Sequence, residues 1–160
     1  MRGWMSESVI HFEPGNLLVE VEHDGRLVRE EVVHNKVTSA GRNVLRDLML
    51  GIGAHPNWIA VGTTSTAAAD TDVALGAEYF RAAVTRRVSS TGKAVFKLHL
   101  TTSDANGSTI REVGLFAYTS YSGSSPLGGG QLFARAVVAP IVKDNTIQVT
   151  FTWEFPITSS

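Results

Sequence analysis

The sequence predicts a mainly β protein of the α+β kind, in which an antiparallel β-sheet or sandwich has one helix packed across it. Three observations predict this class. Residues 146–155 alternate polar and apolar side chains without a break, residues 17–33 hold two β-prone runs around Asp-Gly, and only residues 38–53 show a convincing helical period. A strand with one apolar face and a helix with one apolar stripe each need a partner surface, so the two are expected to pack together.

The first two elements follow from local signals. In residues 17–33, Asp24-Gly25 supplies the positive φ angles of a tight hairpin turn. The helix is expected to begin after Thr38 or Ser39, which can cap it, and to end in a left-handed turn at Gly51 or Gly53. Its apolar stripe consists of Ala40, Val44, Leu45, Leu48 and Met49.

The remaining chain is expected to form strands separated by loops. The predicted strands are 57–62, 79–88, 93–101, 108–118, 131–138 and 146–155, and Ser-Ser-Thr-Gly at 89–92 is expected to join the second and third as a hairpin. Residues 63–78 are small and polar, which favours a long surface loop. Residues 119–130 are rich in Gly and Ser and are expected to be mobile unless a partner orders them.

Size and composition favour one domain of 160 residues with flanking segments. The expected division is an extension with a β-hairpin (1–33), a single β-rich assembly module (34–157) and a short tail (158–160). The net charge of −1 gives no indication of nucleic-acid binding, and no apolar run reaches the length that crosses a bilayer. The absence of cysteine excludes disulfides and thiolate chemistry.

Motifs for catalysis or metal binding are lacking. None of the five histidines forms an HxH, HxxxH or HExxH pair, and no G-x-S-x-G elbow exposes a serine. Asp70 and Asp72 fit a solvated turn better than a calcium loop, because the other acidic positions of such a loop are missing. We therefore predict no catalytic residue, no cofactor and no metal, and a protein that is not an enzyme.

The stretch "STIREVGLFAY" (108–118) places two charges inside an apolar strand. On a strand Arg111 and Glu112 point to opposite faces, so the one that faces the core needs a complementary charge from elsewhere. We predict that Glu112 pairs with Arg81 or Arg135, and favour this over a catalytic carboxylate because no histidine or nucleophile is expected nearby. The predicted structural charge cluster is Glu78, Arg81, Arg111, Glu112 and Arg135.

A second group of charges follows one predicted hairpin. It consists of Arg81, Arg86, Arg87, Lys93 and Lys97. Such a patch can contact phosphates or an acidic partner, but the simpler interpretation is a solvated hairpin tip.

Four pieces in order resemble a known family. They are "HNKVTSAGRNVL", "WIAVGTTSTAAADTDVALGAEYFR", "STIREVGLFAY" with the later "QLFARAVVAPIVK", and "IQVTFTWEFPI". The succession resembles the tail-collar and tail-fibre-attachment modules of tailed bacteriophages over roughly residues 34–157. The resemblance implies a virion structural protein, assembled in the host bacterial cytoplasm, that binds itself, commonly as a homotrimer, and other tail, baseplate or capsid proteins.

Two other roles stay open at this stage. One is a capsid decoration (cement) protein, and the other is a carbohydrate-binding or hydrolytic tail module, for which only Tyr118 and Tyr121 give support. The candidate partner contacts are Trp4, Phe12, Tyr118 and Tyr121, since exposed aromatic side chains make good anchors in a partner's pockets. For Trp4 and Phe12, local packing is an equally good explanation.

Overall fold

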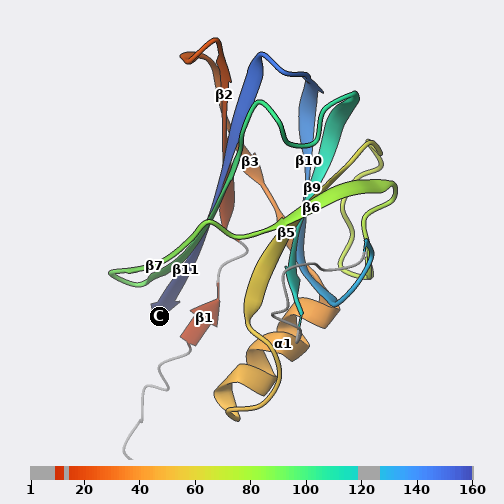
Figure 1. The fold of residues 1–160 in the computed structure, drawn as a ribbon. Coiled ribbons are helices and arrows are strands. Elements are labelled where there is room, and N and C mark those ends of the chain that lie inside the picture. The colour runs from red at the N-terminus through yellow and green to blue at the C-terminus, as the bar shows by residue number, and fades with distance from the viewer. Residues whose placement is uncertain (1–9, 13–14, 119–126, 160) are drawn as a thin grey trace, which may run out of the picture.

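Two antiparallel sheets face each other in the computed structural model, which describes residues 10–12, 15–118 and 127–159 (Figure 1). The first sheet contains β1 (Ile10–Phe12), β2 (Asn16–His23), β3 (Arg26–His34), β7 (Arg86–Ser90), β8 (Lys93–Leu100) and β11 (Ile147–Ser159). The second contains β4 (Lys36–Val37), β5 (Pro56–Gly62), β6 (Glu78–Ala83), β9 (Ser108–Ala117) and β10 (Gln131–Lys143). The strand orders are β3-β2-β11-β8-β7, with β1 pairing β11, and β4-β10-β9-β5-β6. The predicted fold class is confirmed.

The strand β11 lies in the middle of the six-stranded sheet, between β2 and β8. Its alternation is as predicted, because Val149, Phe151, Trp153 and Phe155 are fully buried between the sheets while the residues between them face outward. The apolar face of β11 therefore forms a large part of the core, together with the apolar side chains of the second sheet that pack against it.

The predicted hairpin at 17–33 forms as β2 and β3. Asp24 and Gly25 turn the chain with φ angles of 50° and 76°, the left-handed region that this tight turn requires. However, the hairpin is not an extension ahead of a separate module. Strand β2 pairs with β11, and Leu17 and Val19 are fully buried in the common core. The described residues from Asn16 to Ser159 thus contribute to one sandwich.

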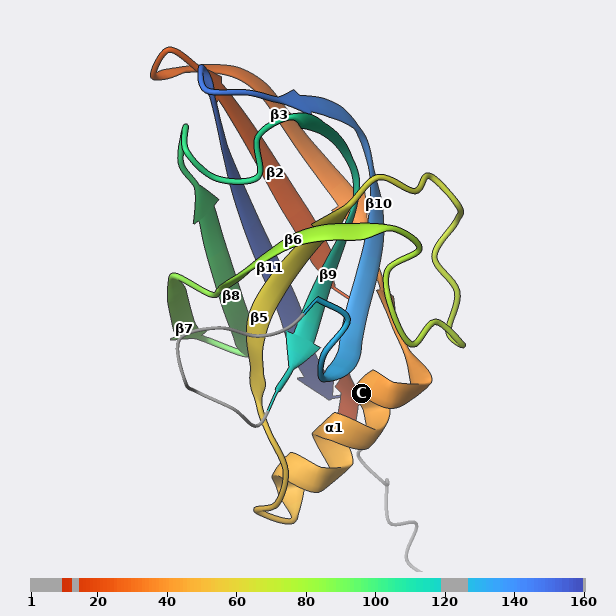
Figure 2. The ribbon, with the colours of Figure 1, turned by 45° about the vertical axis from the view of Figure 1, so that its right-hand side comes forward.

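The helix α1 (Ser39–Met49) packs against β10 and covers one end of the sandwich (Figure 2). Thr38 caps it as predicted, accepting a hydrogen bond at its side-chain oxygen from the Gly41 N–H at 3.0 Å. Gly41 lies so close to the Phe133 carbonyl that a Cβ there would collide with it. The predicted apolar stripe is wrong at its end, because Met49 is 89% exposed.

The predicted strand 79–88 is two strands in two sheets. Val84 donates its backbone N–H to the Asn57 carbonyl at 3.0 Å, and the next residue, Thr85, donates to Lys97 at 2.8 Å. The chain therefore leaves the second sheet as β6 and enters the first as β7 between these residues. The predicted hairpin with 93–101 is consequently only β7–β8.

The two faces of β9 contact different surroundings. Val113 and Leu115 belong to the core between the sheets, whereas Phe116 belongs to a second apolar cluster on the outer face of the five-stranded sheet. Residues 63–77, which connect β5 to β6, cross this outer face and are here called the covering loop (Figure 2). Glu112 lies on the same outer face, since it is four residues from Phe116 on one strand.

Candidate functional site

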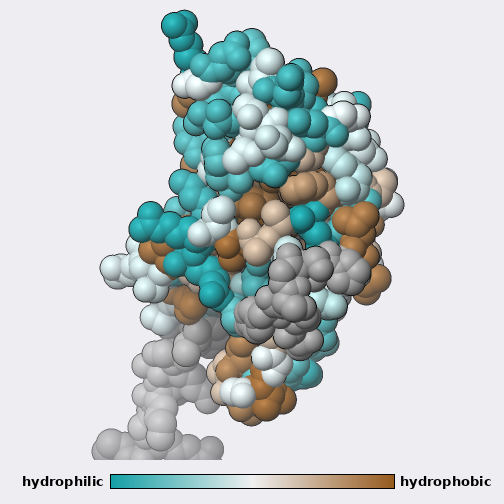
Figure 3. Space-filling view, viewed as in Figure 1, coloured by the Kyte–Doolittle hydropathy of each residue, from teal (hydrophilic) through white to brown (hydrophobic). Residues whose placement is uncertain are grey.

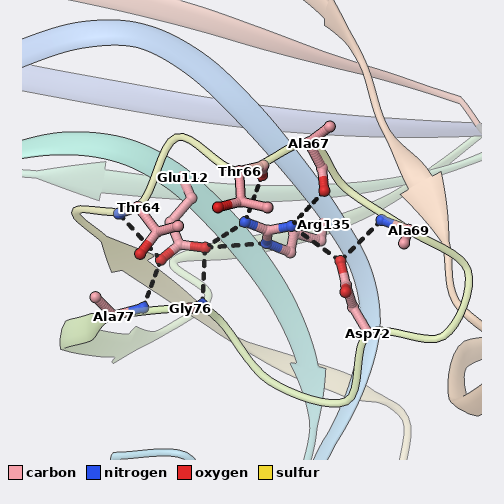
Figure 4. Close-up of polar contacts among 9 residues, drawn as sticks. All are labelled: Thr64, Thr66, Ala67, Ala69, Asp72, Gly76, Ala77, Glu112 and Arg135. Carbon is pink, nitrogen blue, oxygen red and sulfur yellow. Dashed lines mark hydrogen bonds and ion pairs between the residues drawn. The ribbon is translucent and has the colours of Figure 1, made fainter.

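Glu112 binds the covering loop to the second sheet (Figure 4). Its side chain is fully buried, and its carboxylate accepts backbone N–H hydrogen bonds from Ala77 at 2.8 Å, Gly76 at 3.0 Å and Thr64 at 3.4 Å. Across the ladder from Glu112 stands Gly62, where any Cβ would collide with the carboxylate. The glycine that ends β5 therefore leaves the space that this buried acid occupies.

Arg135 on β10 supplies the compensating charge (Figure 4). Its guanidinium nitrogens lie 2.8 and 2.9 Å from Glu112 Oε2 and 2.9 Å from Asp72 Oδ2, and they also donate to the carbonyls of Thr66 and Ala67 at 2.9 and 3.2 Å. The side chain of Arg135 is only 3% exposed. One arginine thus pairs with two carboxylates and donates to two loop carbonyls, and Glu112 has the backbone N–H donors in addition. A buried charge is tolerated when it has partners of this kind.

An apolar contact under the loop accompanies these ion pairs. Leu75 of the loop packs in the outer cluster with Trp58, Phe116 and Leu132, all at most 7% exposed. A Cβ at Gly114 would lie 2.9 Å from Leu75 Cδ2 and 3.1 Å from Leu132 Cδ1. The glycine of "REVGLF" therefore makes room for the leucine of the loop.

A second ion pair lies on the same outer face. Arg81 Nε lies 2.5 Å from Glu78 Oε1, and both side chains are at most 6% exposed. Arg81 also donates to the Gly129 carbonyl at 2.7 Å and stands 4.4 Å over the Phe116 ring, while Glu78 accepts from the Gly128 N–H at 3.0 Å. This pair fastens the segment before β10, whereas the Glu112–Arg135 pair fastens the covering loop.

The predicted charge cluster is thus divided. Of the two predicted partners of Glu112 the structure selects Arg135, and Arg81 binds Glu78 instead. Arg111 is half-buried, and its side chain makes no hydrogen bond or ion pair within the described residues. The sequence placed Asp72 in a solvated turn, whereas its side chain pairs with Arg135. The backbone N–H donors to Glu112 were also missed, because no residue type reveals them.

The candidate partner contacts have mixed surroundings. Phe12 is half-buried, with its ring stacked on Phe155 at 5.6 Å and edge-on to Phe133 at 6.0 Å. Tyr118 is also half-buried, and its backbone exchanges two hydrogen bonds with the Asn57 side chain, at 2.8 and 3.0 Å. Trp4 and Tyr121 lie outside the described residues, as does the 119–126 part of the Gly/Ser-rich segment.

The other charged groups of the described residues have mainly local contacts. His55 and Arg87 contact each other beside a surface hollow of about 500 Å³, and burial, with the nearby Arg87 charge second, lowers the pKa of His55. Asp70 lies 3.8 Å from Arg42 and 3.9 Å from Lys36. Among the described residues, no three histidines or carboxylates gather as a metal site would require.

An apolar tip stands at the end of the molecule where α1 ends (Figure 3). It consists of Leu48, Met49, Leu50 and Ile52, which are 37, 89, 67 and 57% exposed. Single exposed apolar side chains are ordinary, but a contiguous group is typical of a surface that binds another protein.

The fold and this site define a β-sandwich whose outer face is closed by an ion-paired covering loop. No protein-family model, no curated protein and no solved structure matches the chain. In the described part of the chain, no helix has the length and apolar character needed to span a membrane.

Proposed function

We propose that this chain is a structural subunit of a tailed-bacteriophage virion, located in the tail or baseplate or where a tail fibre attaches, and that it acts by binding other proteins. The observation that carries the assembly part of the proposal is the apolar tip. Four neighbouring apolar side chains, of which three are more than half exposed, are costly to leave in water unless a partner covers them.

The phage part of the proposal is supported by the structural roles of the motifs that resemble phage tail modules. In "IREVGLF", Glu112 and Gly114 hold the covering loop, and in the later "LFARA" Arg135 completes the pair. The "VG" before the loop places Gly62 against Glu112, and "TSAG" places Thr38 and Gly41 against β10. The motif residues therefore hold the covering loop and α1 to the second sheet, and this structural role supports a subunit that acts through assembly.

The test is the copy number of the chain in purified virions, measured by quantitative mass spectrometry against the major capsid protein. We expect a small number, on the scale of a tail structure. A number comparable to that of the capsid protein would assign the chain to capsid decoration, and its absence from particles would overturn the virion proposal.

A double variant and a control variant test the role of the apolar tip in virion assembly. Replacing Leu50 and Ile52 with serine is expected to lower incorporation while leaving the fold intact, because both side chains are mostly exposed. The control is Val142→Ser, which changes an equally exposed side chain on β10. Equal incorporation of both variants would show that the tip is not a binding surface.

A further inference from the structure

The outer face of the six-stranded sheet carries two patches of opposite charge, one on each side of β11. On one side Glu20 of β2 stands directly opposite Glu30 of β3. On the other side Lys97 of β8 stands directly opposite Arg86 of β7. All four share the face turned away from the second sheet, because their registers align them with Thr150 and Thr152 of β11.

Each patch is unfavourable in an isolated molecule. Like charges directly opposite on neighbouring strands destabilise a sheet, and Glu22 on the same face adds a third negative charge beside Glu20 and Glu30. None of these five side chains takes part in an ion pair of the described residues. Within the described residues neither patch thus contains an ion pair, and the one pair beside them, Lys93 with Glu154, is formed between other side chains.

The arrangement is complementary to itself. Two strands lie on each side of β11, the acidic patch is on the β2–β3 side, and the basic patch is on the β8–β7 side. A two-fold axis along β11 would lay the acidic patch of one copy over the basic patch of another, twice in the same contact. The two patches are displaced along the strand direction by two residues, or about 7 Å, because Glu20 is level with Thr150 and Lys97 with Thr152. Long charged side chains can span this distance.

We propose that two copies of this chain pair face to face through the six-stranded sheet, with Glu20 and Glu30 of each copy against Arg86 and Lys97 of the other. The pairing rests on the proposed function in taking the chain to be an assembly subunit, and it adds the partner and the surface. It uses a face different from the apolar tip. It also gives a dimer, in place of the trimer that the family resemblance implies.

Apolar side chains on the same face support a protein partner. Leu27, Val28 and Val32 of β3 are 55, 59 and 61% exposed, and the registers place Val32 beside Leu18 and Leu27 beside Glu22 on the outer face. A nucleic acid would be repelled by the acidic half, and a partner of one charge would match only one half. A second copy matches both.

The size of the face sets the expected affinity. Five strands about 4.8 Å apart and roughly eight residues long give a face of about 600 Å². This is below the roughly 800 Å² that each partner buries in a standard interface, so we expect a dissociation constant in the micromolar range. Because exposed charges are screened by salt, dimerisation should weaken as ionic strength rises.

The experiment is a charge swap followed by sedimentation velocity on the purified chain over a range of concentrations at low salt. We expect the wild type to form a dimer, and the double variants E20K/E30K and R86E/K97E each to dissociate at least tenfold more readily. A mixture of the two should form a heterodimer, because one variant then has a basic face and the other an acidic face. The control, R42E/R46E, makes the same change of charge as R86E/K97E but on α1, where both side chains are mostly exposed, and should dimerise as the wild type does.

A monomeric wild type, a trimer, or a mixture that stays dissociated would overturn the pairing. Circular dichroism of each variant establishes that it is folded. Sedimentation uses the isolated chain and the virion count uses particles, so failure of the pairing and failure of the virion proposal are separate results.

Discussion

The carboxylate of Glu112 joins three parts of the chain at a single buried point. One oxygen accepts from the loop at Thr64 and Ala77, and the other accepts from Gly76 and from Arg135 on β10. Because all of these donors point at a group without access to water, the charge of the carboxylate is compensated only while the loop is in place. The loop and the pair therefore depend on each other.

Replacing Glu112 with glutamine tests this at the residue scale. Glutamine keeps the size of the side chain but leaves Arg135 with one buried counter-charge fewer, so we expect the free energy of unfolding to fall by about 3 kcal/mol. The measurement is denaturant unfolding. Glu154→Gln, which breaks a half-exposed pair with Lys93, should cost at most about 1 kcal/mol. Equal losses in the two variants would contradict a structural role for Glu112.

Gly114 gives a second residue-scale prediction. Alanine there would press on Leu75, and we expect a loss of about 1–3 kcal/mol of unfolding free energy from overpacking. In a double-mutant cycle with Leu75→Ala, the loss caused by Gly114→Ala should become smaller, since one of the three side chains that the added methyl would meet is then shortened, while Phe116 and Leu132 stay in place. Strictly additive losses would show that the loop does not press on this position.

At the scale of elements, Tyr79 connects the edge strand β6 to the turn between β8 and β9. Its hydroxyl donates to the Ala105 carbonyl at 3.1 Å, and burial raises the pKa of Tyr79 to about 12 from 10.0. The folded protein thus holds this proton more tightly than the unfolded chain. The resulting stability is complete below pH 10 and is lost as the pH rises through about 12.

The prediction is that Tyr79→Phe flattens the alkaline part of the stability curve. Between pH 10 and about 12 the free energy of unfolding should fall more steeply in the wild type than in the variant, because only the wild type can lose this proton. Denaturant unfolding at several pH values measures it. Parallel curves would show that Tyr79 ionises as readily in the folded protein as in the unfolded chain.

The elements themselves were predictable where local rules decide them. The alternation of β11, the Asp-Gly turn and the Thr38 cap are set by residues within a few positions of one another. The crossing at Val84–Thr85 was not predictable, because a period of two tells which face a side chain takes but not which sheet a strand joins. The pairing of Glu112 with an arginine could be expected, because a buried carboxylate needs a counter-charge. The backbone N–H groups of the covering loop that also bind Glu112 could not, because they depend on the tertiary fold.

At the scale of the whole molecule, the shared core predicts a single cooperative unfolding transition. The hairpin β2–β3 contributes Leu17, fully buried, to the same cluster as Trp153, so it should not unfold by itself. We expect Leu17→Ala to lower the free energy of unfolding by about 2–5 kcal/mol. Tryptophan fluorescence and far-ultraviolet circular dichroism should report the same midpoint.

Hydrogen exchange checks the same prediction amide by amide. The amides of β2 that pair with β11 should be protected by the same free energy as those of β11. Faster exchange throughout β2 would show instead that the hairpin is a separate cooperative unit.

The central place of β11 also has a consequence for synthesis. Strands β2 and β8 are each paired to β11, and in the sheet order they have no contact with each other without it. A ribosome makes residues 16–100 well before residues 147–159. Until β11 has been synthesised, the hairpins β2–β3 and β7–β8 therefore have unpaired strand edges. Such edges favour pairing between chains. Nascent chains stalled before residue 147 should therefore be the form of this protein that most needs a chaperone.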